Sequence, residues 1–96
     1  MERIRTLHPD GKTGVNIEVS KYERIKQAIL DSIQQRGVIS FKELPAAVEE
    51  NLKEPFDGSI GWYTVSVKLD LEARGVIERI PGRSPQQIRM VEERMK

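Results

Sequence analysis

Residues 59–75 read SIGWYTVSVKLDLEARG, and the secondary structure of this stretch decides the fold. Apolar and polar residues alternate from Tyr63 to Leu71, which on its own is typical of a β-strand. Residues 59–74 are long enough for a helix, and their second half consists of residues that favour one. Gly75 then supplies a left-handed stop, so we favour a helix instead. We therefore expect a helix with two apolar rows on nearly opposite sides. One row holds Ile60, Tyr63, Val67 and Leu71, and the other holds Trp62, Val65 and Leu69.

A first helix is predicted upstream, over residues 20–36. Ser20 and Glu23 form a capping box, in which each side chain satisfies an unpaired backbone N–H at the helix start. Apolar residues then recur at spacings of three and four, so one stripe of the helix faces a core. Gly37 ends the helix. The stripe consists of Tyr22, Ile25, Ile29 and Ile33.

A second helix is expected after a short extended segment at residues 38–39, which is either a very short strand or a link. Ser40 and Glu43 form a second capping box, and the helix runs to about Leu52. Pro45 lacks a backbone N–H, so we expect a distorted first turn.

The two ends of the chain have different patterns. Residues 76–80 and 86–91 flank the five-residue loop Pro81-Gly82-Arg83-Ser84-Pro85, which predicts a β-hairpin. Residues 92–96 are a charged tail. Residues 1–19 are rich in turn formers and predict an irregular arm without a core pattern of its own. The fold class is therefore α+β, with three helices and a C-terminal two-stranded hairpin in one domain over residues 20–91.

Composition bounds the function. The 96 residues suit one domain, and 38% hydrophobic with 32% charged residues is typical of a folded protein. There is no cysteine, no apolar run near the ~20 residues of a membrane span, and no apolar leader at the start, so a cytoplasmic protein is expected. The net charge of +1 is too small for general attraction to nucleic acid. Locally, residues 20–36 contain four basic and two acidic residues, and residues 76–96 contain five basic and three acidic residues. Both segments therefore have a mild positive charge.

The element order resembles that of a winged helix-turn-helix, over about residues 20–91. Residues 71–79 resemble the junction of recognition helix and wing in bacterial regulators. The chain also resembles a small bacterial family of uncharacterised winged-helix proteins, in the His8–Lys12 arm and in residues 61–63 and 67–71. That resemblance implies a fold and no established activity.

In winged-helix regulators the third helix enters the major groove and the wing tip contacts the backbone or the minor groove. Arg83 lies at the apex of the wing loop, where a long cation reaches a phosphate or is simply a solvated turn residue. The DNA contacts that the resemblance implies are Ser59, Thr64, Ser66 and Lys68 on the helix and Arg79, Arg83 and Arg89 on the wing.

The outward row of the third helix departs from the regulator pattern. A groove-facing surface offers Arg, Lys, Asn, Gln or small polar groups, whereas this row is Trp62, Val65 and Leu69. Such a row is normally covered by a partner or by the chain's own arm. Trp62 is thus a core or arm-packing residue, a dimer contact, or a stacking platform for nucleic acid, although stacking residues usually have basic neighbours.

Motifs for catalysis or metal binding are incomplete. Residues 11–13 read Gly-Lys-Thr, but a phosphate-binding loop needs a glycine at the position of Thr6. His8 and Asp10, two apart in a turn and with no second histidine, are expected to bond locally rather than to bind a metal. We expect no metal, no cofactor and no small-molecule ligand.

Two carboxylate pairs lie on predicted helices, Glu49 with Glu50 and Asp70 with Glu72. With lysines and arginines nearby, both pairs are expected to be solvated helix faces rather than an acid and a base. No nucleophile, base and orienting group converge, so we expect that the chain is not an enzyme.

Two functions remain. The first is a DNA-binding transcription regulator or accessory factor, possibly a homodimer, that binds double-stranded DNA. The second is a protein interaction or dimerisation module in which Trp62, Val65 and Leu69 form the interface.

Overall fold

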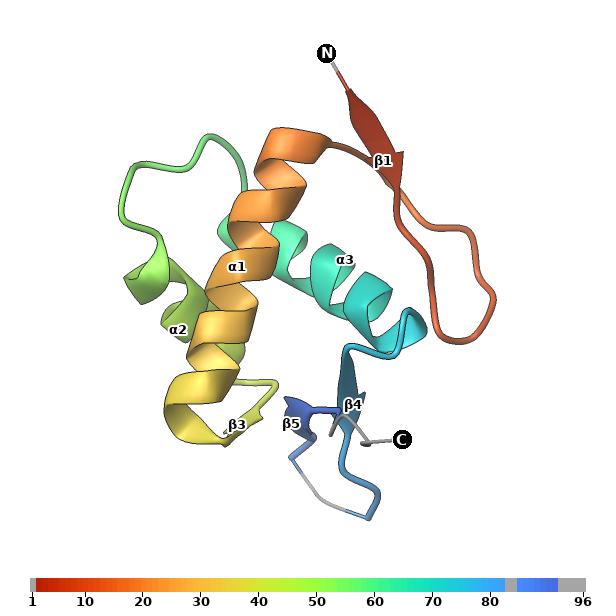
Figure 1. Cartoon of the computed structure of the whole chain (residues 1–96), viewed down its shortest axis with the longest axis vertical. Helices are drawn as coiled ribbons and strands as arrows, with labels where there is room; N and C mark the ends of the chain where they lie inside the picture. The colour runs from red at the N-terminus through yellow and green to blue at the C-terminus, as the bar shows by residue number, and fades with distance from the viewer. Residues whose placement is uncertain (1, 83–84, 92–96) are drawn as a thin grey trace, which may run out of the picture.

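Three helices pack together beside two small antiparallel sheets in the computed structural model, which describes residues 2–82 and 85–91 (Figure 1). The architecture of this part of the chain is therefore α+β, as predicted. In chain order the elements are β1 (Arg3–Arg5), β2 (Asn16–Glu18), α1 (Val19–Arg36), β3 (Val38–Ser40), α2 (Leu44–Asn51), α3 (Ile60–Ala73), β4 (Ile77–Arg79) and β5 (Gln87–Met90).

Helix α1 has the predicted apolar stripe, which forms the centre of the core. Its start differs from the prediction, because the helix begins at Val19 and no side chain caps it. Strand β2 runs directly into α1, and the Val19 N–H donates to the Glu2 carbonyl at 3.0 Å. This backbone bond replaces the capping box predicted at Ser20. Gly37 ends the helix with a φ of 78°, as predicted. The buried residues of α1 are Tyr22, Ile25, Ala28, Ile29, Ser32 and Ile33.

Helix α2 is short and follows a turn. Ser40 Oγ accepts from the Glu43 N–H at 3.1 Å, which is one of the two bonds of the predicted capping box. The Glu43 carboxylate accepts from the Ser40 hydroxyl at 2.8 Å, and both bonds lie in the turn that precedes the helix. Pro45 lies at the very start of α2, where a missing N–H costs no helical hydrogen bond.

The stretch at residues 60–73 is a helix, as predicted. Ser59 caps it by accepting the Trp62 N–H at 3.2 Å. Val67 and Leu71 are fully buried, which confirms the inward row. The buried face of α3 is nevertheless wider than predicted, because three polar side chains lie in it as well. These are Thr64, Lys68 and Asp70.

One sheet has the strand order β3-β5-β4, with both neighbouring pairs antiparallel. The segment predicted as a strand or a link is therefore a strand, and it adds a third strand to the predicted pair. Ile39, Ile77 and Ile88 turn inward and close the core from this side. Residues 83–84, between β4 and β5, lie outside the described residues.

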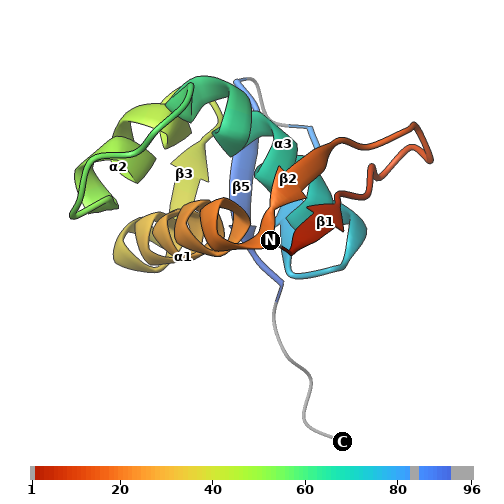
Figure 2. The same ribbon diagram turned by 90° about the horizontal axis from the view of Figure 1, so that it is seen from above.

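The arm is more regular than predicted. β1 and β2 pair antiparallel, with Ile4 opposite Ile17, and Ile17 is buried in the core. The Thr6 N–H donates to the Val15 carbonyl at 2.8 Å, and the Val15 N–H donates to Thr6 Oγ1 at 2.9 Å. The predicted irregular arm is therefore a two-stranded hairpin that places Ile17 in the core, and its connecting residues 6–15 lie outside helices and strands. Figure 2 shows this hairpin on the α3 side of the molecule, away from α2.

Candidate nucleic-acid interface

The outward face of α3 is apolar and partly open. Trp62 is 48% exposed and Val65 is 37% exposed. Farther along the helix, Ser66 and Leu69 are half-buried and share a small pocket with the arm segments 6–8 and 13–15. The arm thus flanks the second half of the predicted interface row, and the first half, at Trp62, stays open.

Two of the predicted DNA contacts are wrong, because their side chains lie inside the protein. Thr64 and Lys68 are buried, and a buried side chain cannot contact a groove. Lys68 Nζ donates to Gln86 Oε1 at 2.7 Å, lies 4.7 Å from the centre of the Phe41 ring and forms an ion pair with Glu72. Lys68 therefore joins α3 to the segments next to β3 and β5.

The remaining predicted contacts on α3 are serines. Ser59 is exposed, but its hydroxyl oxygen accepts the helix-capping hydrogen bond. Ser66 lies beside the arm. Because Lys68 is the only basic residue in the sequence of α3, the open face of this helix carries no cation.

Two of the three predicted wing cations lie next to a carboxylate. Arg79 Nε lies 3.4 Å from Glu72 Oε1, and Arg89 Nε lies 2.7 Å from Glu78 Oε2. Both arginine side chains are about half exposed, so they can contact a ligand. The nearby carboxylates of Glu72 and Glu78 weaken the attraction of these arginines for an anion. Arg83 lies outside the described residues.

An aromatic cluster occupies the start of α3. We use this name for Phe56, Trp62 and Tyr63. The Tyr63 ring contacts both of the others edge to face, with its centre 5.0 Å from that of Phe56 and 4.9 Å from that of Trp62. Gly58 makes the contact possible, because a Cβ there would lie 2.7 Å from Tyr63 Cε2. The rings hold one another in place, and Trp62 forms the exposed end of the cluster.

Two cations of α1 lie against this cluster. Lys21 Nζ is 5.6 Å from the centre of the Tyr63 ring, and Arg24 Cζ is 5.3 Å from that of Phe56. The Arg24 guanidinium donates to the carbonyls of Glu54 at 2.7 Å and Pro55 at 3.2 Å. Within the part of the chain that the structure describes, its hydrogen-bond partners are therefore neutral backbone carbonyls and not carboxylates.

The sequence reasoning missed this grouping. It found the basic bias of the first helix and the apolar row of the third, but it did not bring the two together. Lys21 is 42 positions before Tyr63, and only the packing of α1 on α3 brings its ammonium group to that ring. Lys21 also lies 3.9 Å from Asp57 Oδ2, whose side chain is fully exposed. An acidic group therefore borders the cluster on its loop side.

A buried carboxylate joins the arm to the helices. Asp70 Oδ1 accepts from the Leu7 N–H at 2.8 Å, and Oδ2 accepts from the Tyr22 hydroxyl and from Arg74 Nε at 2.8 Å. Burial and this hydrogen bond raise the pKa of Tyr22, and the bond to Asp70 raises the pKa of Arg74. Because both oxygens of Asp70 are occupied and shielded from solvent, its role is structural.

Glu72, the second carboxylate of the pair predicted as solvated, is also shielded from solvent. The Glu72 side chain is only 6% exposed, since Lys68 and Arg79 approach it from two sides. The interpretation of Asp70 and Glu72 as a solvated helix face is thus wrong. Glu49 and Glu50 are exposed, as predicted.

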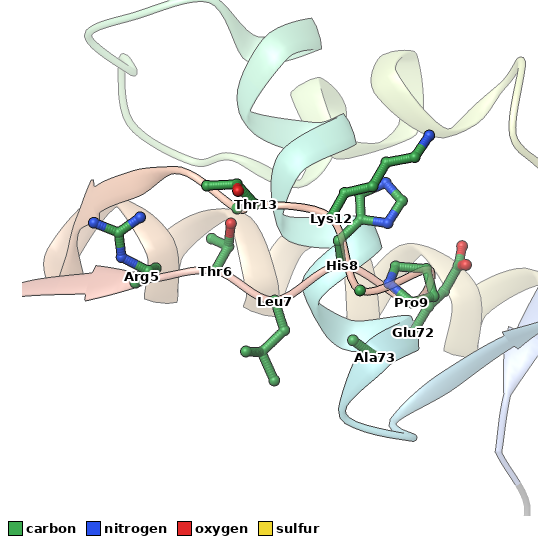
Figure 3. Close-up of a pocket in the computed structure, with 11 residues that line it drawn as sticks. Arg5, Thr6, Leu7, His8, Pro9, Lys12, Thr13, Glu72 and Ala73 are labelled. Atoms are coloured by element: carbon green, nitrogen blue, oxygen red, sulfur yellow. The ribbon is translucent and has the colours of Figure 1, made fainter.

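A pocket of about 590 Å³ lies between the arm and the end of α3 (Figure 3). Its polar lining includes Arg5, His8, Lys12 and Glu72. In Figure 3 Arg5 lies at one end, whereas His8 and Lys12 lie at the other. The His8 ring accepts the Asp10 N–H through Nδ1 at 3.1 Å, which is the local turn bonding that was predicted. The side chains of Arg5 and Lys12 do not converge on one point, so we assign this pocket no ligand.

Within residues 2–82 and 85–91, no three histidine or carboxylate side chains gather as metal ligands. None of the helices in this part of the chain has the length and apolar character needed to cross a membrane.

Comparison with known proteins identifies a family. A family model described as a family of unknown function, DUF6958, matches residues 3–88. No curated protein and no solved structure matches the chain.

Proposed function

The chain belongs to the DUF6958 family of unknown function, and for it we propose the role of a winged-helix domain that binds DNA through the start of α3. The element order α1-β3-α2-α3-β4-β5 supports the winged-helix part of this proposal. Strand β3 supports it further, since it ties the segment between α1 and α2 to the β4–β5 pair. In this reading β4, β5 and their connection are the wing. A DNA-binding domain of this kind serves as a transcription regulator or accessory factor.

The observation that carries the proposal is the position of Lys21 and Arg24 beside the aromatic cluster. Cations attract the phosphate backbone, and exposed aromatic rings contact bases. Tyr63 links the two kinds of group, because its ring packs against that of Trp62 and its centre lies 5.6 Å from Lys21 Nζ. Helix α1 thus supplies the aromatic cluster with cations that the sequence around Trp62 lacks.

Binding to labelled DNA, followed by fluorescence anisotropy over a range of salt concentrations, tests this proposal. Affinity is expected to fall steeply as salt rises, because bound cations displace counterions from the phosphates. Arg24→Gln and Lys21→Gln are each expected to weaken binding and to reduce the salt slope by about one unit.

Arg36→Gln is the matched control for these variants. Arg36 is a cation at the opposite end of α1, 3.6 Å from Glu43 Oε2, and it lies outside the proposed interface. We expect its replacement to leave binding nearly unchanged. An absence of DNA binding at low salt, or equal losses for Arg24→Gln and Arg36→Gln, would overturn the proposal.

A second candidate function is homodimerisation through α3. It is favoured by the open face of Trp62 and Val65, which bears no charge and therefore does not repel a second copy of itself. Leu69 extends this face toward the arm. Sedimentation over a concentration series tests it. Trp62→Asp should then convert a dimer to a folded monomer, and a native chain that stays monomeric at high concentration rules the candidate out.

A further inference from the structure

We propose that the nucleic acid bound at this site is single-stranded, with an unpaired base stacked on Trp62. This inference rests on the proposed function and specifies which form of nucleic acid the interface takes. It follows from three features of the start of α3, namely an exposed ring that is held in place, a helix face without base-reading groups, and cations at a short distance.

The first feature is the fixed indole ring. Half of the Trp62 surface is open to solvent, yet the ring packs edge to face with Tyr63 at an interplanar angle of 85°. Tyr63 in turn packs against Phe56, at 78°. An exposed aromatic side chain that is already ordered loses little conformational freedom when a base stacks on it. Trp62 therefore meets the requirement for a stacking platform.

The second feature argues against reading a duplex. Recognition in the major groove needs side chains that hydrogen-bond with base edges. The exposed residues of α3 are Gly61, Trp62 and Val65, whose side chains offer no amide, guanidinium, carboxylate or hydroxyl group. Stacking needs only the face of a base. In a duplex the base faces are covered by their neighbours, whereas an unpaired strand leaves them accessible.

The third feature is the distance to the cations. Lys21 Nζ lies 5.6 Å from the centre of the Tyr63 ring, which lies 4.9 Å from the centre of the Trp62 ring. Lys21 Nζ is therefore no more than about 11 Å from the centre of the Trp62 ring. About three nucleotides span this distance even at the ~3.4 Å rise of a stacked strand. A strand with one base on Trp62 is thus long enough to bring a flanking phosphate to Lys21, whose side chain is 24% exposed. Arg24 lies against the Phe56 ring of the same cluster.

Removing the charge of Asp57 tests the proposal through an increase in affinity for nucleic acid. Its exposed carboxylate lies 3.9 Å from Lys21 and repels a phosphate that approaches this cation. Asp57→Asn is therefore expected to tighten binding severalfold. Glu50→Gln is the matched control, because Glu50 is an exposed carboxylate on α2. Its replacement changes the net charge by the same amount, away from the cluster.

Trp62 is the only tryptophan of the chain, so its fluorescence reports on this position alone. The decisive experiment titrates the native chain at low salt with a short oligothymidylate and with a blunt-ended duplex of equal length. We expect the single strand to quench Trp62 fluorescence and to bind roughly tenfold more tightly than the duplex. Trp62→Leu should lower single-strand affinity by roughly tenfold, and Trp62→Phe should restore part of it.

The outcomes separate this inference from the proposed function. Duplex binding that equals or exceeds single-strand binding, without quenching, overturns the single-strand inference and leaves the DNA-binding function standing. Binding of neither nucleic acid overturns both. Should Trp62→Leu leave single-strand affinity intact and instead change the oligomeric state, the face is a protein contact and the inference fails. Circular dichroism of each variant verifies that it is folded.

Discussion

The backbone N–H of Leu7 donates a hydrogen bond to Oδ1 of Asp70 at 2.8 Å, across 63 positions of sequence. The other oxygen of this carboxylate accepts from Tyr22 and Arg74. One buried side chain therefore joins the arm to α1 and to the end of α3. The arm in turn flanks Leu69, so this junction also limits how much of the apolar face of α3 is open.

Replacing Asp70 tests how strongly the junction stabilises the fold. Asp70→Ala leaves the Leu7 N–H and the Tyr22 hydroxyl without their acceptor in a buried position. We expect the free energy of unfolding to fall by about 3 kcal/mol. Asp70→Asn keeps the shape and a carbonyl oxygen for Leu7, and should cost less. Urea unfolding followed by circular dichroism measures both variants, and a neutral Asp70→Ala would contradict the structural role of this carboxylate.

The stability of the domain should fall at high pH. The pKa of Tyr22 is raised from its ordinary value of 10.0 by burial and by the hydrogen bond to Asp70. The folded state therefore holds this proton more tightly than the unfolded state does. The contribution of Tyr22 is complete below pH 10 and is lost progressively as the pH rises above it.

Thermal unfolding from neutral to strongly alkaline pH measures this loss. Tyr22→Phe should be less stable than the native chain at neutral pH, because it lacks the hydroxyl, and its stability should fall less above pH 10. Tyr63→Phe is the control, since Tyr63 is only half-buried. Equal alkaline losses in the native chain and in Tyr22→Phe would argue against the raised pKa.

Gly14→Ala should disrupt the arm. A Cβ on Gly14 would lie 1.8 Å from the carbonyl oxygen of Thr6, so the two sides of the hairpin would have to separate. We expect faster hydrogen exchange at the Thr6 and Val15 amides. Gly61→Ala is the contrasting variant, because a Cβ there meets open space within a helix. That variant should stabilise the domain by up to about 1 kcal/mol. Slow exchange at both amides in Gly14→Ala would contradict this account.

The Lys68–Glu72 pair should show strong coupling. Lys68→Ala leaves a carboxylate that is 6% exposed with Arg79 as its remaining cation, and should cost about 3 kcal/mol or more. The double variant Lys68→Met, Glu72→Leu removes both charges and should recover much of that loss. A double-mutant cycle by urea unfolding measures the coupling. Additive losses would show that the two side chains act independently.

The sequence by itself determined the helices and their inward faces. The spacing of Ile25, Ile29 and Ile33 specified the buried stripe of α1, and Gly37 specified where that helix ends. These features follow from local geometry, because apolar periodicity and a left-handed residue act within a few turns of chain. The decision between helix and strand at residues 60–73 could also be made from length and local preference.

Tertiary structure alone decided which polar residues are buried and which surfaces meet. Periodicity placed Thr64 and Lys68 outside the inward row, yet both are buried, and Lys68 contacts Phe41 and Gln86 beside β3 and β5. The arm looked irregular because its pairing spans a turn-rich loop, and its anchor, Asp70, lies far along the chain. Likewise, the aromatic cluster acquires Lys21 as a neighbour only through the packing of α1 on α3. Local patterns do not encode contacts between distant segments, so the candidate site emerged only from the packed structure.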